Sequence, residues 1–168
     1  MPHLEKAAVL DPNNAETLTN LGTVRLLLGQ VGEAADAFER AVRLEPDSAR
    51  AHSDFGTASL AQGRLDRAVS ELTRATELDP SRATFRSNLA HALEVSGKLE
   101  QALASAKRAT ELDPKLGSAW INVGTASAKL GHYAEARQAF ERARALDPTD
   151  PRPAANIEEL DALAPTKR

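Results

Sequence analysis

Apolar residues recur along the chain at spacings of three and four positions. The stretch from 34 to 44 is typical, because polar residues separate its apolar ones: Ala34, Ala37, Phe38, Ala41, Val42 and Leu44. This spacing places the apolar side chains on one stripe of a helix, whereas a strand requires strict alternation. The pattern predicts an all-α protein built from amphipathic helices.

A tripeptide punctuates these helices at intervals of 34 residues. Its copies are Leu10-Asp11-Pro12, Leu44-Glu45-Pro46, Leu78-Asp79-Pro80, Leu112-Asp113-Pro114 and Leu146-Asp147-Pro148. Proline cannot continue the hydrogen-bond ladder of a helix, so each copy is expected to end one. Each interval also holds a glycine at a fixed place, namely Gly29, Gly63, Gly97 and Gly131, and glycine ends a helix readily. The 34-residue unit is therefore predicted to be helix, tight turn, helix, repeated along the chain.

These units resemble the tetratricopeptide repeat, whose pattern is W-x2-L-G-x2-Y, then A-x3-F, then P. Residues 117–150 carry it as Trp120, Val123, Gly124, Ala136, Phe140, Ala143 and Pro148. Residues 15–48, 49–82 and 83–116 carry weaker copies, with His52 and Arg86 in the tryptophan place of two units. The resemblance implies a right-handed α-solenoid with small residues where helices approach closely.

The ends of the chain are expected to differ from the four full units. Residues 1–14 align with the second helix of a truncated upstream repeat, spanning 3–10. Residues 151–168 read as a terminal capping helix followed by a frayed tail at 164–168.

Composition excludes several classes of function. The chain has no cysteine, and its net charge of −3 disfavours nucleic-acid binding. No apolar stretch approaches the roughly 20 residues that cross a bilayer, and no secretory signal is visible, which is compatible with a cytoplasmic location.

The sequence offers no catalytic or metal-binding constellation. The histidines His3, His52, His91 and His132 fall at different phases of different repeats, without ligand spacing and with no carboxylate expected beside them on one face. The glycines are spaced at 34 and do not cluster into a phosphate-binding loop. We therefore expect a non-enzymatic protein that uses no cofactor and no metal.

In the family that the units resemble, the first helices line a concave groove that binds peptides. The sixth position of each first helix forms a ladder of Asn20, Asp54, Asn88, Asn122 and Asn156. An asparagine amide both donates and accepts, so it can hold the main chain of an extended ligand. The predicted groove also includes Thr23, Thr57, His91, Thr125, Lys129 and Arg50. The resemblance implies a protein–protein interaction scaffold that binds a peptide or a partner segment.

Two other interpretations stay open. The ladder is similar to that of O-linked N-acetylglucosamine transferase, so the chain is alternatively an accessory repeat region of a larger enzyme such as a glycosyltransferase. A self-assembling oligomer, docked through the N-terminal helix, is the other alternative. The family's clamp for a C-terminal carboxylate is not expected, because its basic positions hold Thr19, Thr23, Thr84 and Asn88.

Overall fold

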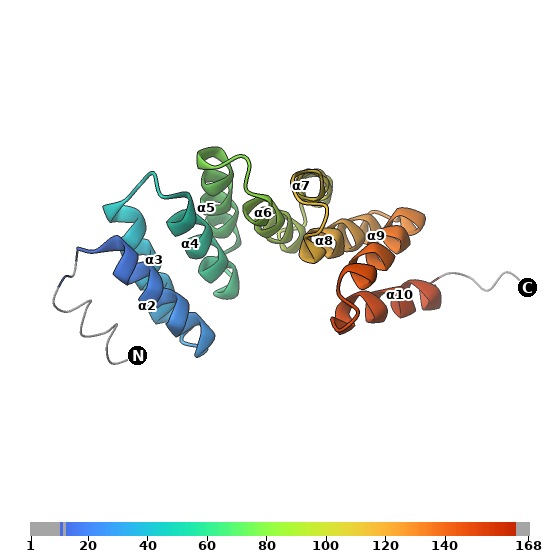
Figure 1. Cartoon of the computed structure of the whole chain (residues 1–168), viewed down its shortest axis with the longest axis horizontal. Helices are drawn as coiled ribbons and strands as arrows, with labels where there is room; N and C mark the ends of the chain where they lie inside the picture. The colour runs from blue at the N-terminus through green and yellow to red at the C-terminus, as the bar shows by residue number, and fades with distance from the viewer. Residues whose placement is uncertain (1–10, 12, 164–168) are drawn as a thin grey trace, which may run out of the picture. The chain divides into compact units, whose positions relative to one another are not determined.

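The computed structural model describes residue 11 and residues 13–163 of the chain. Every helix or strand in this part is an α-helix, as Figure 1 shows. The helices are α2 (Ala15–Leu27), α3 (Val31–Leu44), α4 (Ala49–Ala61), α5 (Leu65–Leu78), α6 (Ala83–Val95), α7 (Leu99–Leu112), α8 (Gly117–Lys129), α9 (Tyr133–Leu146) and α10 (Pro151–Leu163). The prediction of an all-α protein is confirmed. The expected helix 3–10, its proposed role in self-association and the expected tail 164–168 lie outside the described residues.

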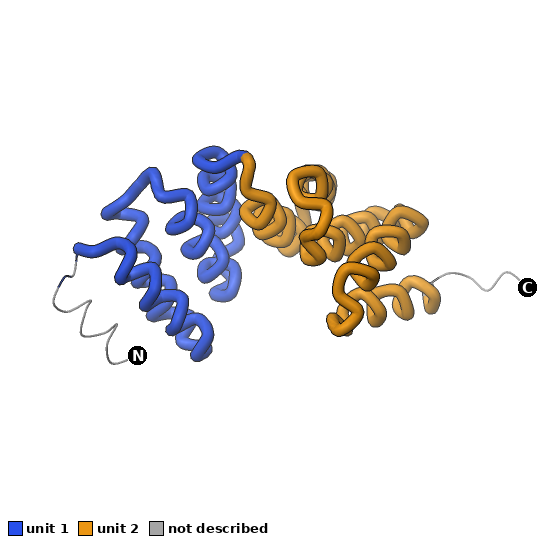
Figure 2. Tube along the Cα trace, in the orientation of Figure 1, with its two compact units in different colours: residues 1–80 blue, residues 81–168 orange. Residues whose placement is uncertain are grey.

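The chain divides into two compact units, Met1–Pro80 and Ser81–Arg168 (Figure 2). The first contains α2 to α5 and the second contains α6 to α10. In each unit, helices that are consecutive in sequence pack against each other. The first helices of neighbouring repeats also meet: α2 contacts α4, α6 contacts α8, and α8 contacts α10. Within each unit this is the stacking of helix pairs that the repeat pattern predicts.

A glycine with positive φ joins the two helices of each repeat. The φ angle is 76° at Gly29, 73° at Gly63, 75° at Gly97 and 81° at Gly131. At the first of these turns, the backbone N–H of Gln30 donates to the Arg25 carbonyl (2.9 Å) and that of Gly29 donates to the Leu26 carbonyl (3.0 Å). These two bonds form a Schellman motif, which requires a left-handed residue. A Cβ atom at any of the four glycines would meet nothing within 4 Å. The predicted helix-ending role of the glycines is confirmed, and its cause is backbone conformation.

The second helix of each repeat ends two residues before a proline, as predicted, and the carbonyl of that proline receives a side-chain hydrogen bond in two repeats. The Trp120 Nε1–H group donates to the Pro114 carbonyl oxygen at 2.9 Å. His52 occupies the equivalent place 68 residues earlier, and its Nε2 atom lies 2.9 Å from the Pro46 carbonyl oxygen. The histidine thus reproduces the hydrogen bond of the tryptophan that it replaces.

The other nitrogen of the His52 ring contacts a buried carboxylate. Its Nδ1 atom lies 2.6 Å from Glu71 Oε2, and Arg67 Nη1 donates to Glu71 Oε1 at 3.1 Å. His52 is 7% exposed and Glu71 is 8% exposed. Because a carbonyl and a carboxylate oxygen only accept, both ring nitrogens donate here, as they do in an imidazolium.

The expectation that no carboxylate accompanies the histidines is therefore wrong. Besides the His52–Glu71 contact, His91 Nδ1 lies 3.5 Å from Glu94 Oε2 and His132 Nδ1 lies 3.9 Å from Glu135 Oε2. The latter two pairs are separated by three residues on or next to one helix, which brings the side chains to the same face. Each of these three histidines has its own glutamate, and the pairs lie apart on different repeats.

Close approach of the two helices in a repeat depends on complementary residue sizes. A Cβ atom added at Gly124 would lie 2.4 Å from Phe140 Cε1, so the aromatic ring occupies the space that a side chain would need. The repeat 83–116 has Ala90 in the glycine place and Ala106 in the phenylalanine place, and both are buried. A smaller residue on the second helix thus accompanies a larger one on the first. Two further repeats use glycine in this way: Gly22 against Phe38, and Gly56 against Leu72.

Among the described helices, none combines the length and the apolar character needed to cross a bilayer.

Candidate peptide-binding groove

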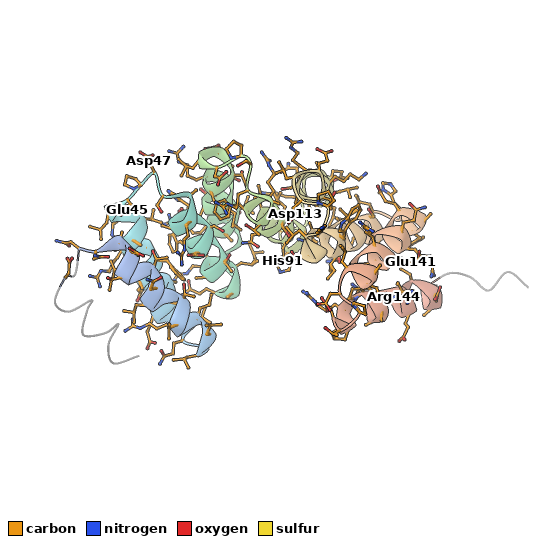
Figure 3. All side chains as sticks on the ribbon, viewed as in Figure 1. Glu45, Asp47, His91, Asp113, Glu141 and Arg144 are labelled. Carbon is orange, nitrogen blue, oxygen red and sulfur yellow. The ribbon has the colours of Figure 1, made fainter. Side chains whose placement is uncertain are left out.

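A hollow of about 360 Å³ lies against the first helices of the second unit. Its lining comes from α6, α8 and the start of α10, and it includes four of the predicted groove residues: Asn88, His91, Asn122 and Thr125. Figure 3 labels His91 on α6. Residues at three- and four-position spacing share one face of a helix, which explains why these side chains converge. We call this hollow the polar groove.

A second hollow, of about 240 Å³, adjoins the polar groove through Thr125, which lines both. It also contains Lys129 and Asn156, two further residues of the prediction. Its apolar walls come from Ala128, Tyr133, Phe140 and Leu160 on α8, α9 and α10. The prediction did not include Tyr133 or Phe140, because they belong to a second helix of a repeat. The structure therefore places five predicted residues and Asn156 in two adjoining hollows.

The amide of Asn122 has a structural partner across the helix pair α6–α8. Its Nδ2 group donates to the Ser87 carbonyl oxygen at 2.8 Å and approaches Ser87 Oγ at 3.1 Å. The described residues supply no donor to its Oδ1 atom. One end of the amide thus holds two repeats together, and the other end is an acceptor directed at the polar groove or its edge.

Charged side chains at the polar groove are paired. Glu94, whose side chain is 10% exposed, forms ion pairs with Lys129 from α8 and with His91 one turn earlier on α6. Arg152 contacts Asp150 at 2.7 Å, and this guanidinium holds the pKa of Asp150 below its ordinary value. The groove is therefore polar without a large excess of either charge.

The predicted residues of the first unit lie on α2 and α4. Thr23 and Thr57 each donate their hydroxyl to a carbonyl one turn earlier in their own helix, at 2.9 Å. Arg50 Nε lies 3.5 Å from Asp54 Oδ2. Burial raises the pKa of Asp54, and the nearby Arg50 guanidinium opposes that shift only in part. Asn20 is half-buried on α2. The acidic member of the ladder is thus the one whose charge is costly.

No group of three or more potential metal ligands occurs among the residues that the structure describes.

Comparison with known proteins gives consistent results. A family model described as tetratricopeptide repeat matches residues 2–49, 19–83, 53–116 and 87–151. A search of curated proteins found no match.

Several solved structures are similar to this chain. The crystal structure of MamA is 26% identical over 86% of this chain and 85% of its own, with a TM-score of 0.76. YrrB, described as a TPR protein with an unusual peptide-binding site, is 25% identical over 92% of this chain and 80% of its own, with a TM-score of 0.76. PilF of Pseudomonas aeruginosa is 22% identical over 89% of this chain and 68% of its own, and its TM-score of 0.80 shows the shared fold. Because the family model matches overlapping stretches over most of its length, the chain belongs to the tetratricopeptide repeat family.

Proposed function

We propose that this protein is a non-catalytic scaffold that binds an extended segment of a partner protein along α6, α8 and α10 of the second unit. The observation that carries the proposal is the polar groove with its adjoining apolar hollow. Peptide sites commonly combine a few placed polar groups with pockets for alternate side chains.

Asn122 supports binding through the main chain of the ligand. Its amide nitrogen is held by Ser87, so the position of its oxygen is fixed before a ligand arrives. A preformed acceptor avoids part of the entropy cost of ordering a side chain on binding. A backbone N–H of an extended segment is the matching donor.

The relatives add support by analogy. YrrB is described as having a peptide-binding site, and it aligns with 92% of this chain. The absence of catalysis in our proposal rests on the dispersal of the histidines, each next to a single glutamate on a different repeat.

The test is a selection of phage-displayed random peptides on the whole chain, followed by anisotropy measurements with the enriched peptide. The blocking variant is Ser118→Phe, because Ser118 is exposed and lines the polar groove. The control is Ala104→Phe, which adds the same ring at an exposed position of α7.

We expect Ser118→Phe to weaken binding at least about tenfold, since a ring in the groove displaces ligand contacts. Ala104→Phe should bind as the unchanged protein does. Equal affinities for the two variants, or failure to enrich any peptide, contradict the proposal.

A further inference from the structure

A third hollow lies on the opposite side of α8 from the polar groove. It measures about 460 Å³ and is built from α7, α8 and α9: Lys107, Thr110, Glu111, Trp120, Val123, Glu135, Gln138, Ala139 and Arg142. On α8 it uses Trp120 and Val123, whereas the polar groove uses Ser118, Ile121, Asn122 and Thr125. Helical geometry of about 100° per residue puts these two sets on opposite faces. We call the third hollow the tryptophan hollow.

The floor of the tryptophan hollow is apolar and rigid. Trp120 is held by the hydrogen bond from its Nε1 atom to the Pro114 carbonyl oxygen, and Val123 and Ala139 are buried beside it. Tryptophan and arginine are the side chains that most often dominate the energy of protein interfaces.

The charges around the floor leave one cation without a partner. Lys107 Nζ lies 2.6 Å from Glu135 Oε1, and Arg108 pairs with Glu111 at 2.7 Å. These contacts neutralise both acids of the lining. Arg142 has no ion-pair partner among the described residues.

The equivalent place in the first unit shows what Arg142 lacks. There, 68 residues earlier, Arg74 pairs with Asp47 at 3.2 Å and with Glu77 at 3.4 Å. The positions equivalent to these two acids hold Lys115 and Ala145, so both carboxylate partners are replaced. The floor changes as well, from the ion pair of His52 and Glu71 to Trp120 and Ala139.

We propose that the tryptophan hollow is a second docking site, which binds a partner segment that has a carboxylate next to a large apolar side chain. The apolar side chain covers the Trp120 ring, and the carboxylate accepts hydrogen bonds from the Arg142 guanidinium, where Asp47 and Glu77 satisfy Arg74 in the first unit. Arginine binds carboxylates in a planar, charge-assisted geometry, which favours an acid over a neutral amide. Because this site lies on the other face of α8, it does not depend on the function proposed for the polar groove.

The experiment uses two capped dipeptide amides, phenylalanine-aspartate and phenylalanine-asparagine, with the intact chain. Trp120 is the only tryptophan of the protein, so its fluorescence reports on this site, and amide NMR shifts at Lys107, Thr110 and Gln138 locate the probe. We expect the acidic peptide to bind in the millimolar range and the amide peptide about tenfold more weakly.

Two variants remove the proposed contact in different ways. Arg142→Gln deletes the charge, and Ala145→Glu supplies an internal partner three residues away, as Glu77 does for Arg74. Both should weaken the acidic peptide about tenfold. Arg144→Gln is the matched control, because Arg144 is an exposed arginine on another face of the same helix (Figure 3) and should leave binding unchanged. Ser118→Phe, which blocks the polar groove, should also leave it unchanged.

Three results would overturn the proposal. They are equal binding of the two dipeptides, equal losses in Arg142→Gln and Arg144→Gln, or shifts that fall outside the residues of the tryptophan hollow. Loss of peptide selection in the polar groove with intact dipeptide binding would count against the function proposed there and leave this one standing.

Discussion

The contact between Gly124 and Phe140 predicts a strong energetic coupling between two helices. A Cβ atom at residue 124 would lie 2.4 Å from the ring, about 1 Å short of ordinary contact, so the ring or the helix must move. Overpacking of this kind costs about 1–3 kcal/mol. Alanine is also the better helix former by about 1 kcal/mol, so Gly124→Ala should destabilise by a net amount of up to about 2 kcal/mol.

Removing the ring should reverse the sign of that effect. Phe140→Ala alone should cost about 3–5 kcal/mol through the cavity that it leaves. In that background the overpacking disappears, and Gly124→Ala should stabilise by up to about 1 kcal/mol. The double variant then carries the alanine pair that the protein already has at Ala90 and Ala106.

The assay is a double-mutant cycle in urea, followed by Trp120 fluorescence and by circular dichroism. Trp120 lies in the same repeat, so it reports the unfolding of this part of the second unit. We expect a coupling energy of about 1–3 kcal/mol. If Gly124→Ala changes the free energy of unfolding equally in both backgrounds, the size-matching explanation is refuted.

Three further predictions concern ionised side chains. His52→Ala should lower the free energy of unfolding by about 2–4 kcal/mol, because it leaves the buried Glu71 carboxylate with one partner, and a loss below 1 kcal/mol in a urea titration would contradict this. Asp54→Asn should raise the melting temperature at neutral pH, since a carboxyl with a raised folded-state pKa loses stability as the pH rises through that pKa. The gain should vanish below about pH 4, where the unfolded carboxyl is also protonated, and a gain that persists there would exclude burial of charge as its cause. Lys107→Gln should raise the pKa of Glu135, which the hydrogen bond from Lys107 lowers most, so its carboxyl signal in an NMR titration should shift to higher pH. The stability that the unchanged Glu135 contributes is present above the ordinary carboxyl range and is lost as the pH falls through the lowered pKa.

Local residue chemistry was sufficient to predict the helices and their turns. The positive φ of Gly29 and the end of α3 before Pro46 follow from what glycine and proline allow in any protein. The face shared by Asn88 and Asn122 follows in the same way from a constant 34-residue spacing.

Partners that are distant in sequence could not be predicted. The bonds of Asn122 to Ser87, and of His52 to Glu71, depend on how each helix is rotated against its neighbour, which the period does not specify. Tyr133 was missed for the same reason, since nothing in its own repeat shows that α9 begins at the wall of a hollow. The signal that could have revealed Arg142 was the repeat itself, had its charges been compared unit by unit with the first one.

The glycine turns also have a stereochemical consequence. A Cβ atom at Gly131 would meet no neighbour, so only the handedness of natural amino acids disfavours a side chain there. A D-alanine, installed by chemical ligation, prefers the positive φ of 81° that this turn already has. It would also restrict the unfolded chain more than glycine does, which stabilises the folded state. The four turns are thus points at which a mirror-image residue, carrying a label or a cross-link, can be attached without disturbing either helix.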